Sequence, residues 1–107
     1  MPPDVLNSLT SLWKRQRYEY LTGSRIVCKT PGFLVYAHLG NESSTARYAK
    51  IYDGESANEQ EIVSLDAPAK GNDSFSPPLP TPFQRGLYAV VENDSCPLTI
   101  VFITIKE

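Results

Sequence analysis

Proline is the residue that most restricts the fold of this chain. Nine of the 107 residues are proline, against six glycines, and the prolines are spread from residue 2 to residue 97. An interior proline removes one helix hydrogen bond and clashes with the preceding turn, so this distribution excludes a mostly helical fold. The aromatic residues, which make up 10% of the chain and include six tyrosines, favour strands instead.

Segments with the length of strands lie between turn signals. Apolar runs, some of them alternating, predict strands over residues 25–29, 33–39, 46–52, 61–65, 86–92 and 98–105. In the second run, alternation puts Phe33, Val35, Ala37 and Leu39 on one face. The last run is apolar on both faces, so we expect it to be central or covered on both sides, and to form a hairpin with the run before it.

Two segments differ from this pattern. Residues 66–82 hold five of the nine prolines and are expected to form a long extended connection, because too few residues follow them for a second domain. Residues 1–22 begin with a helix-like spacing and end in an alternating segment. We therefore expect an N-terminal arm or short helix over 1–22, followed by a single antiparallel β-sandwich or jelly-roll-like domain over 23–107.

The charge is distributed unevenly. The net charge of −2 gives no overall attraction to nucleic acid or to an anionic membrane. Residues 1–54 carry seven basic and four acidic side chains, whereas residues 55–107 carry three basic and eight acidic ones. Identical copies could pack with the basic region of one against the acidic region of the next. Alternatively, neighbouring charges cancel within one fold.

Sequence signals for compartment are few. No apolar run approaches the roughly 20 residues of a membrane helix, and the N-terminus has neither the basic start nor the apolar stretch of a secretion signal. We expect the chain to stay in the cytosol or in an assembly built there. In that compartment two reduced thiols are favoured for Cys28 and Cys96 over a disulfide between them, which two cysteines also allow.

No catalytic constellation emerges. His38 is the single histidine, on the strand face shared with Leu34 and Tyr36, and no nucleophile or orienting partner can be named for it. Together with the two cysteines it falls short of the four ligands that zinc takes. The prediction is a non-enzymatic protein without metal or cofactor.

An acidic cluster follows the third predicted strand. It consists of Asp53, Glu55, Glu59 and Glu61. A calcium loop needs oxygen ligands at alternating positions and a closing bidentate glutamate, and this spacing has neither. We interpret the cluster as a solvated loop.

The run Lys14–Arg17 lies among aromatic residues. Such a run can neutralise phosphates and stack on bases, but Trp, Tyr and Arg are also the residues enriched in protein interfaces. With a negative net charge, a protein interface is favoured over nucleic acid, and the 66–82 connection is a second candidate contact surface. The candidate interface residues are Trp13, Arg15, Arg17, Tyr18, Tyr20, Pro78 and Leu79.

The order of strands and turns resembles that of small β-sandwich structural proteins of tailed-bacteriophage virions. The resemblance covers roughly residues 24–105 and is carried by Ser24-Arg25-Ile26-Val27, Pro31-Gly32-Phe33-Leu34-Val35, Ala46-Arg47-Tyr48-Ala49-Lys50-Ile51-Tyr52-Asp53-Gly54 and Phe83-Gln84-Arg85-Gly86-Leu87-Tyr88-Ala89-Val90-Val91. These motifs form turns and strands, so the resemblance does not identify any binding residue in this chain.

The resemblance implies a capsid decoration or cement protein that binds the major capsid protein or other virion proteins and its own copies, with a trimer favoured. Its place would be the capsid surface of the virion, after assembly in the host cytoplasm. A head–neck or tail connector component is a further possibility. A different class of function is a carbohydrate- or receptor-binding module of a fibre, in which Tyr36, Tyr48, Tyr52 and Tyr88 would form an aromatic platform.

Overall fold

The computed structural model describes residue 14 and residues 16–92 and 96–105. These residues form strands and connecting turns and loops, with no helix among them. The strands are β1 (Gln16–Leu21), β2 (Arg25–Cys28), β3 (Gly32–Gly40), β4 (Arg47–Asp53), β5 (Gln60–Ala67), β6 (Asn72–Phe75), β7 (Thr81–Phe83), β8 (Leu87–Val91) and β9 (Leu98–Thr104).

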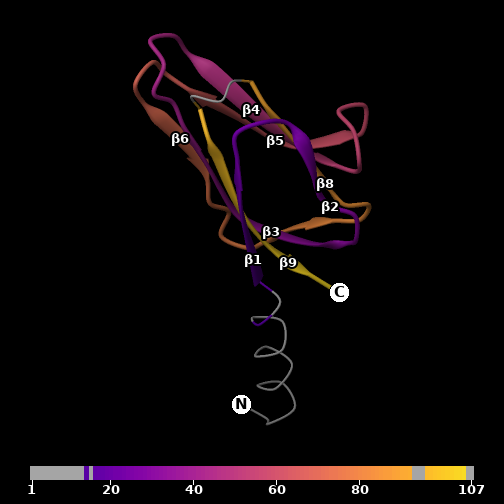
Figure 1. The fold of residues 1–107 in the computed structure, drawn as a ribbon. Helices are drawn as coiled ribbons and strands as arrows, with labels where there is room; N and C mark the ends of the chain where they lie inside the picture. The colour runs from indigo at the N-terminus through magenta and orange to yellow at the C-terminus, as the bar shows by residue number, and fades with distance from the viewer. Residues whose placement is uncertain (1–13, 15, 93–95, 106–107) are drawn as a thin grey trace.

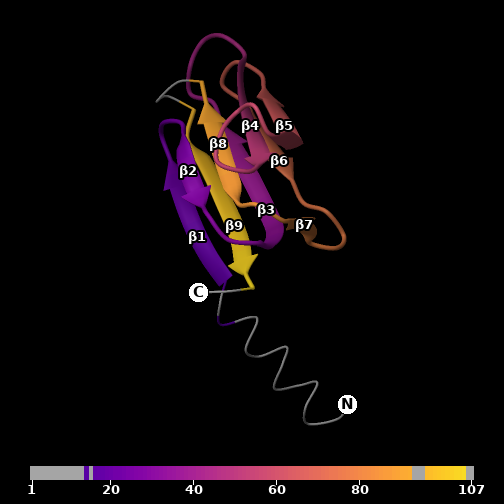
Figure 2. The same ribbon diagram turned by 90° about the vertical axis from the view of Figure 1, so that its right-hand side faces the viewer.

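The strands form two antiparallel sheets packed face to face (Figures 1 and 2). Sheet A has the order β1-β9-β3-β6, with the short β7 also paired to β3, and sheet B has the order β2-β8-β4-β5. Along the chain, every connection passes from one sheet to the other except those from β4 to β5 and from β6 to β7. This is the strand order of a jelly roll, a double-sheet fold built from two Greek keys. The predicted fold class is confirmed.

The space between the sheets is filled by alternate side chains of each strand. Fully buried residues come from both sheets, among them Leu34, Leu39 and Ile100 of sheet A and Ile51 and Leu87 of sheet B. Successive side chains of a strand point to opposite faces, so the residues between these point away from the core. Apolar burial of this kind is the main stabilising term of the fold.

β9 is central, as its apolar sequence predicts. It pairs with β1 from Leu98 to Ile103 and with β3 from Leu98 to Thr104. The predicted hairpin of the last two strands is wrong, because β8 pairs with β2 and β4 in sheet B while β9 belongs to sheet A. A turn signal between two apolar runs indicates reversal of the chain, but it does not distinguish a hairpin from a connection that crosses between sheets.

The predicted face of β3 is wrong at its start. A register irregularity between Leu34 and Tyr36 breaks the alternation at Val35. Leu34 therefore joins Ala37 and Leu39 in the core, while Phe33 lies on the other face. An extra residue of this kind exchanges the inward and outward positions of the residues on one side of it. An apolar run carries no sequence signal for such an irregularity.

Both segments that the sequence set apart contribute strands. Residues 66–67 of the predicted 66–82 connection end β5, β6 pairs with residues 37–40 of β3, and β7 pairs with residues 32–34. The described half of the predicted 1–22 arm is β1, an edge strand of sheet A. The expected helix at the start of the arm lies outside the described residues.

Asn41 fixes the loop that follows β3. Its side chain is 3% exposed, and Nδ2 donates to the carbonyl oxygens of Thr45, Ala67 and Pro68 at 2.8–3.1 Å. Its Oδ1 accepts hydrogen bonds from the amide and the hydroxyl of Ser43. A buried amide with all of its partners in place ties this loop to the end of β5.

We expect Asn41→Ala to lower the free energy of unfolding by about 2 kcal/mol or more, because it leaves buried carbonyl groups without donors. Chemical denaturation followed by circular dichroism measures this loss. Asn58→Ala, at an exposed loop position, is the matched control and should change it by less than about 0.5 kcal/mol. Equal effects of the two substitutions would contradict the role given to Asn41.

Candidate protein interface

Two of the motifs that carry the resemblance bind each other. The Asp53 carboxylate accepts hydrogen bonds from the backbone amides of Gln84 and Arg85 at 2.7–3.0 Å, and the Gly54 amide donates to the Gly86 carbonyl at 3.1 Å. Gly86 has φ +141°, and a Cβ there would lie 2.4 Å from the Cys28 carbonyl oxygen. Glycine is therefore required for this close approach, and the motifs have a structural role.

Other members of the acidic cluster also form contacts within the fold. Beyond Asp53, Glu59 forms an ion pair with Arg85 at 2.7 Å, and Glu61 pairs with Lys50 at 3.6 Å. No group of three His, Cys, Asp or Glu residues capable of holding a metal occurs within the described part of the chain. Asp53 thus ends β4 and Glu61 lies in β5, while Glu55 and Glu59 lie in the loop between these strands.

His38 lies on the outward face of sheet A. Its ring stacks on Tyr36 with centroids 6.4 Å apart and planes at 6°.

The Cys28 thiol donates to the Thr30 carbonyl oxygen at 3.3 Å. Across the described residues, no helix is long and apolar enough to cross a membrane.

The outward face of sheet A is apolar across three strands. The strand register aligns Tyr18 of β1, Val101 of β9 and Tyr36 of β3 in one row. We call the full set the outer apolar face, which consists of Gln16, Tyr18, Tyr20, Phe33, Tyr36, His38, Thr99, Val101 and Ile103. It contains no Lys, Arg, Asp or Glu.

Arg17, Tyr18 and Tyr20, three of the predicted interface residues, lie on β1 at the margin of this face. Tyr18 and Tyr20 are 69% and 65% exposed, the Tyr18 hydroxyl accepts a hydrogen bond from Gln16 Nε2, and Arg17 is exposed. Trp13 and Arg15 lie outside the described residues. The predicted interface residues did not include Phe33, Val101 and Ile103, although the sequence of β9, apolar on both faces, already indicated that its second face needs cover.

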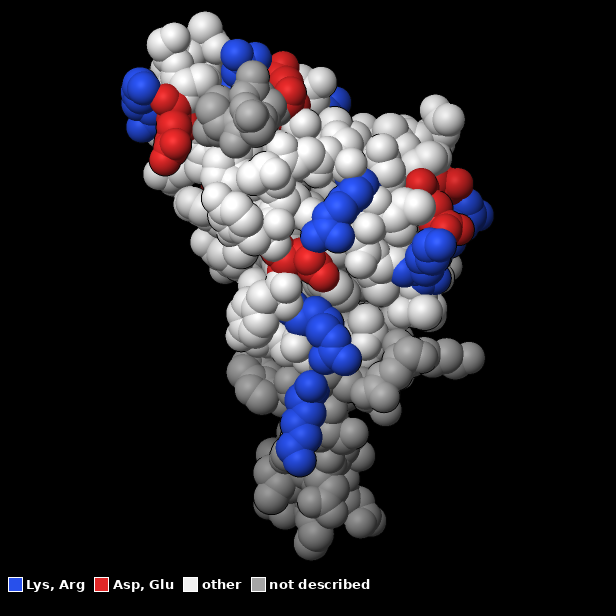
Figure 3. All heavy atoms as spheres, viewed as in Figure 1, with Lys and Arg blue, Asp and Glu red and all other residues white. Residues whose placement is uncertain are grey.

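Charge gathers beside the outer apolar face. Figure 3 shows Lys and Arg side chains, with acidic atoms between them, in a line along the edge where β1 and β2 meet, next to a surface without charge. Arg25 of β2 bridges this edge by an ion pair with Glu19 of β1 at 2.7 Å. Within β1 and β2 themselves, Arg17 and Arg25 are basic and Glu19 is acidic, and Lys14 and Lys29 flank these strands in the sequence.

The remaining two predicted residues, Pro78 and Leu79, are both exposed, Leu79 by 78%. They precede β7, in which Pro82 pairs with Phe33, and Phe33 lies in the same row as Ile103 and the first residue of β1, Gln16. The loop 76–80, the start of β1 and the exposed Ile105 therefore lie toward one end of the sandwich, which we call the basal end (Figure 2).

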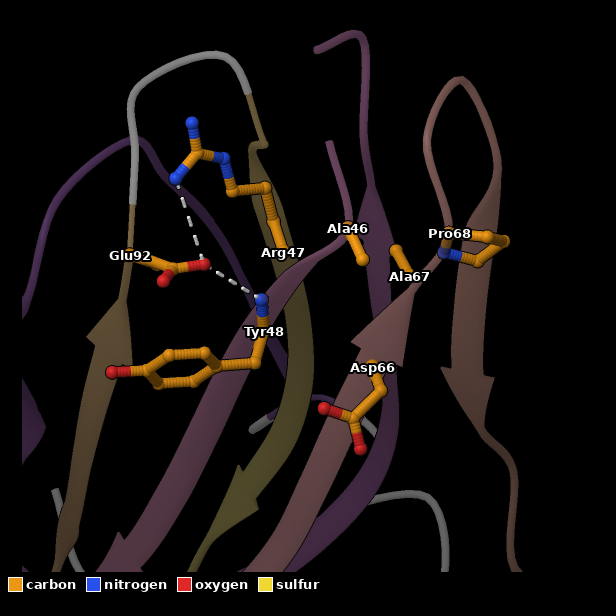
Figure 4. A pocket seen from close by; sticks show the side chains of 7 residues that line it. All are labelled: Ala46, Arg47, Tyr48, Asp66, Ala67, Pro68 and Glu92. Atoms are coloured by element: carbon orange, nitrogen blue, oxygen red, sulfur yellow. Dashed lines mark hydrogen bonds and ion pairs between the residues drawn. The ribbon is translucent and has the colours of Figure 1, made fainter. Parts of the chain in front are cut away.

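The proposed aromatic platform is divided between the two sheets. Tyr36 belongs to the outer apolar face, whereas Tyr52 and Tyr88 are paired neighbours on sheet B, with Tyr48 further along β4. Beside Tyr48 lies an open hollow of about 340 Å³. Figure 4 shows that it is lined by Ala46, Arg47, Tyr48, Asp66, Ala67, Pro68 and Glu92.

The polar groups of this hollow are partly engaged with one another. Glu92 Oε1 accepts a hydrogen bond from the Tyr48 amide at 3.2 Å and lies 4.0 Å from Arg47 (Figure 4). Within the described residues, Nε of Arg47 is buried without a hydrogen-bond partner. Lys50 Nζ lies 5.7 Å from the centre of the Tyr48 ring.

No family model matches this chain, and no curated protein or solved structure is significantly similar to it.

We expect Asp53→Ala to lower the free energy of unfolding by about 1–3 kcal/mol, because two backbone donors lose a charged acceptor. Glu55→Ala, two residues away and exposed, should change it by less than about 0.5 kcal/mol. Thermal and chemical denaturation of both variants measure the difference. A stability of Asp53→Ala equal to that of Glu55→Ala would overturn the structural role of the motif.

Proposed function

We propose that this protein is a non-enzymatic structural component of a tailed-bacteriophage virion, a decoration or cement protein that binds capsid subunits and stabilises the head. The resemblance of residues 24–105 to such proteins supports this proposal. The jelly roll supports it as well, since capsid proteins are among the users of this fold, although a fold alone does not specify a function.

The basal end is the observation that carries the proposal. It brings the start of β1, to which the N-terminal segment is attached, to the same end as Leu79 and Ile105, which are 78% and 43% exposed. Exposed apolar side chains on a loop serve as anchors when a partner surface buries them. In this proposal the basal end faces the shell, and burial of these anchors between subunits makes the shell harder to pull apart.

Particle binding tests the proposal. The protein should be present in purified intact virions, and added protein should bind particles that lack it and raise their resistance to heat. Leu79→Asp should weaken this binding about tenfold or more, because it places a charge where an apolar anchor is buried. Co-sedimentation of labelled protein with particles measures the affinity.

Ile26→Asp is the matched control for Leu79→Asp. Ile26 is exposed to 36% on the outward face of sheet B, outside the loop 76–80, and its substitution should leave particle binding unchanged. Absence of the protein from intact virions would refute the proposed function. Equal binding by the two variants would refute the assignment of the basal end.

The hollow on sheet B favours a second candidate function, binding of a carbohydrate. A tyrosine ring beside carboxylates and a guanidinium is a combination that stacks on a sugar ring and bonds its hydroxyl groups. The volume is at the lower end of the range of small-molecule sites. In this case the isolated protein would act as a recognition module of a fibre.

A glycan array with the purified protein tests this second function. A sugar ligand should be retained by the wild type and lost on Tyr48→Ala. Tyr36→Ala, on the opposite sheet, should keep binding, because Tyr36 is not part of the hollow. An array without ligands, or equal loss in both variants, would exclude the carbohydrate function.

A further inference from the structure

The loop 76–80 projects from one edge of β3. β9 occupies the other edge, so β6 and β7 both pair with the same edge, β6 as far as Ala37 and β7 as far as Leu34. These two residues are three positions apart, which is about 10 Å along a strand. The chain from Phe75 to Thr81 can reach about 20 Å. The surplus length takes the loop outward from the sheet (Figure 2).

Proline keeps this segment out of the sheet. Pro77, Pro78 and Pro80 have no amide hydrogen and cannot donate to β3, whereas Ser76 and Leu79 keep theirs. The loop therefore has few backbone donors and a full set of carbonyl acceptors.

The projecting loop is apolar, exposed and uncharged. The chain bends at Pro78 and Leu79, so these residues form its tip. Leu79 is 78% exposed, and Pro78 and Pro80 on either side of it are exposed as well. No charged residue lies between Asp73 and Arg85 in the sequence. The loop therefore presents a continuous surface of proline rings and one leucine side chain.

Both ends of the loop are anchored in the core. Phe83 is 1% exposed, and Phe75 packs against the buried cluster. Within the loop 76–80, three of the five residues are proline, and each proline ring holds φ at about −65°. A segment that is held at both ends and stiffened in this way loses little conformational entropy when a partner binds it. The loop is preorganised for recognition.

The surface that receives this loop has to match its chemistry. Aromatic rings bury a large apolar area, and the hydroxyl of tyrosine and the N–H of tryptophan can bond to the loop carbonyls. Grooves lined by aromatic side chains recognise proline-rich segments in other proteins. A charged groove would lose hydration without gaining an ion pair, because the loop carries no charge.

We propose that the loop 76–80 binds in an uncharged groove of a capsid subunit that is lined by tyrosine or tryptophan side chains. This inference rests on the proposed function and deepens it, because it names the chemistry of the surface that receives Leu79. The leucine side chain supplies apolar burial, the proline rings pack on the aromatic rings, and the groove donates hydrogen bonds to the loop carbonyls.

Co-sedimentation of the labelled full chain with particles separates the role of the prolines from that of Leu79. The double substitution Pro78→Ala and Pro80→Ala keeps the leucine and should weaken binding about tenfold, because it removes two rings and frees the unbound loop. Pro68→Ala, at an exposed proline outside the loop, is the matched control and should leave the affinity unchanged. Circular dichroism and a cooperative thermal transition verify that each variant folds.

Photochemical cross-linking identifies the receiving surface. p-Benzoylphenylalanine in place of Ser76 puts the reactive group at the exposed start of the loop. After irradiation of loaded particles, mass spectrometry should find it attached to a capsid subunit beside a tyrosine or tryptophan.

The outcomes distinguish this inference from the proposed function. Unchanged binding by the double proline variant overturns the inference and leaves the proposed function standing. Cross-links only to segments without tyrosine or tryptophan, or to a second copy of this chain, have the same consequence. A wild-type chain that does not bind particles refutes the proposed function, and the inference with it.

Discussion

The structure depends on β9, a strand that is apolar on both faces. Its inward residues, such as Ile100, pack against sheet B, and its hydrogen bonds hold β1 on one side and β3 on the other. A strand of this composition is stable only where both faces are covered. The fold covers one face with the second sheet, and the other face carries the aromatic side chains of the neighbouring strands. The apolar residues of β9 therefore contribute both to the core and to the outer apolar face.

The motifs that make the chain resemble virion proteins stabilise the closure of sheet B. Asp53 accepts from two amides of the segment before β8, and Gly86 allows that segment to touch the chain at Cys28. These contacts are made to the backbone, so any chain that forms the same pair of turns needs a carboxylate and a glycine at these two positions. They explain why the resemblance indicates a fold, while the surface that recognises partners has to be found from exposure and charge.

Sequence patterns predicted the features that depend on local chemistry. The turns, the strand character of each run and the central position of β9 follow from proline, glycine and apolar spacing. The inward face of β3 could not be predicted from the sequence, because the irregularity at Val35 leaves no local signal. The partners of β8 could not be predicted either, since the choice of partner between two sheets depends on long-range packing. Leu79 was singled out by its proline-rich surroundings, but its position at the same end of the sandwich as the start of β1 required the register of β7.

The outer apolar face and the basal end share one row of residues. Gln16, Ile103 and Phe33 lie in register across β1, β9 and β3 at that end of sheet A. The basal end is therefore continuous with the outward face of the sheet. In the proposed function, a shell that covers Leu79 also lies next to this row, because β7 pairs with the start of β3. The register that brings apolar side chains of three strands into one face thus places that face beside the proposed capsid contact.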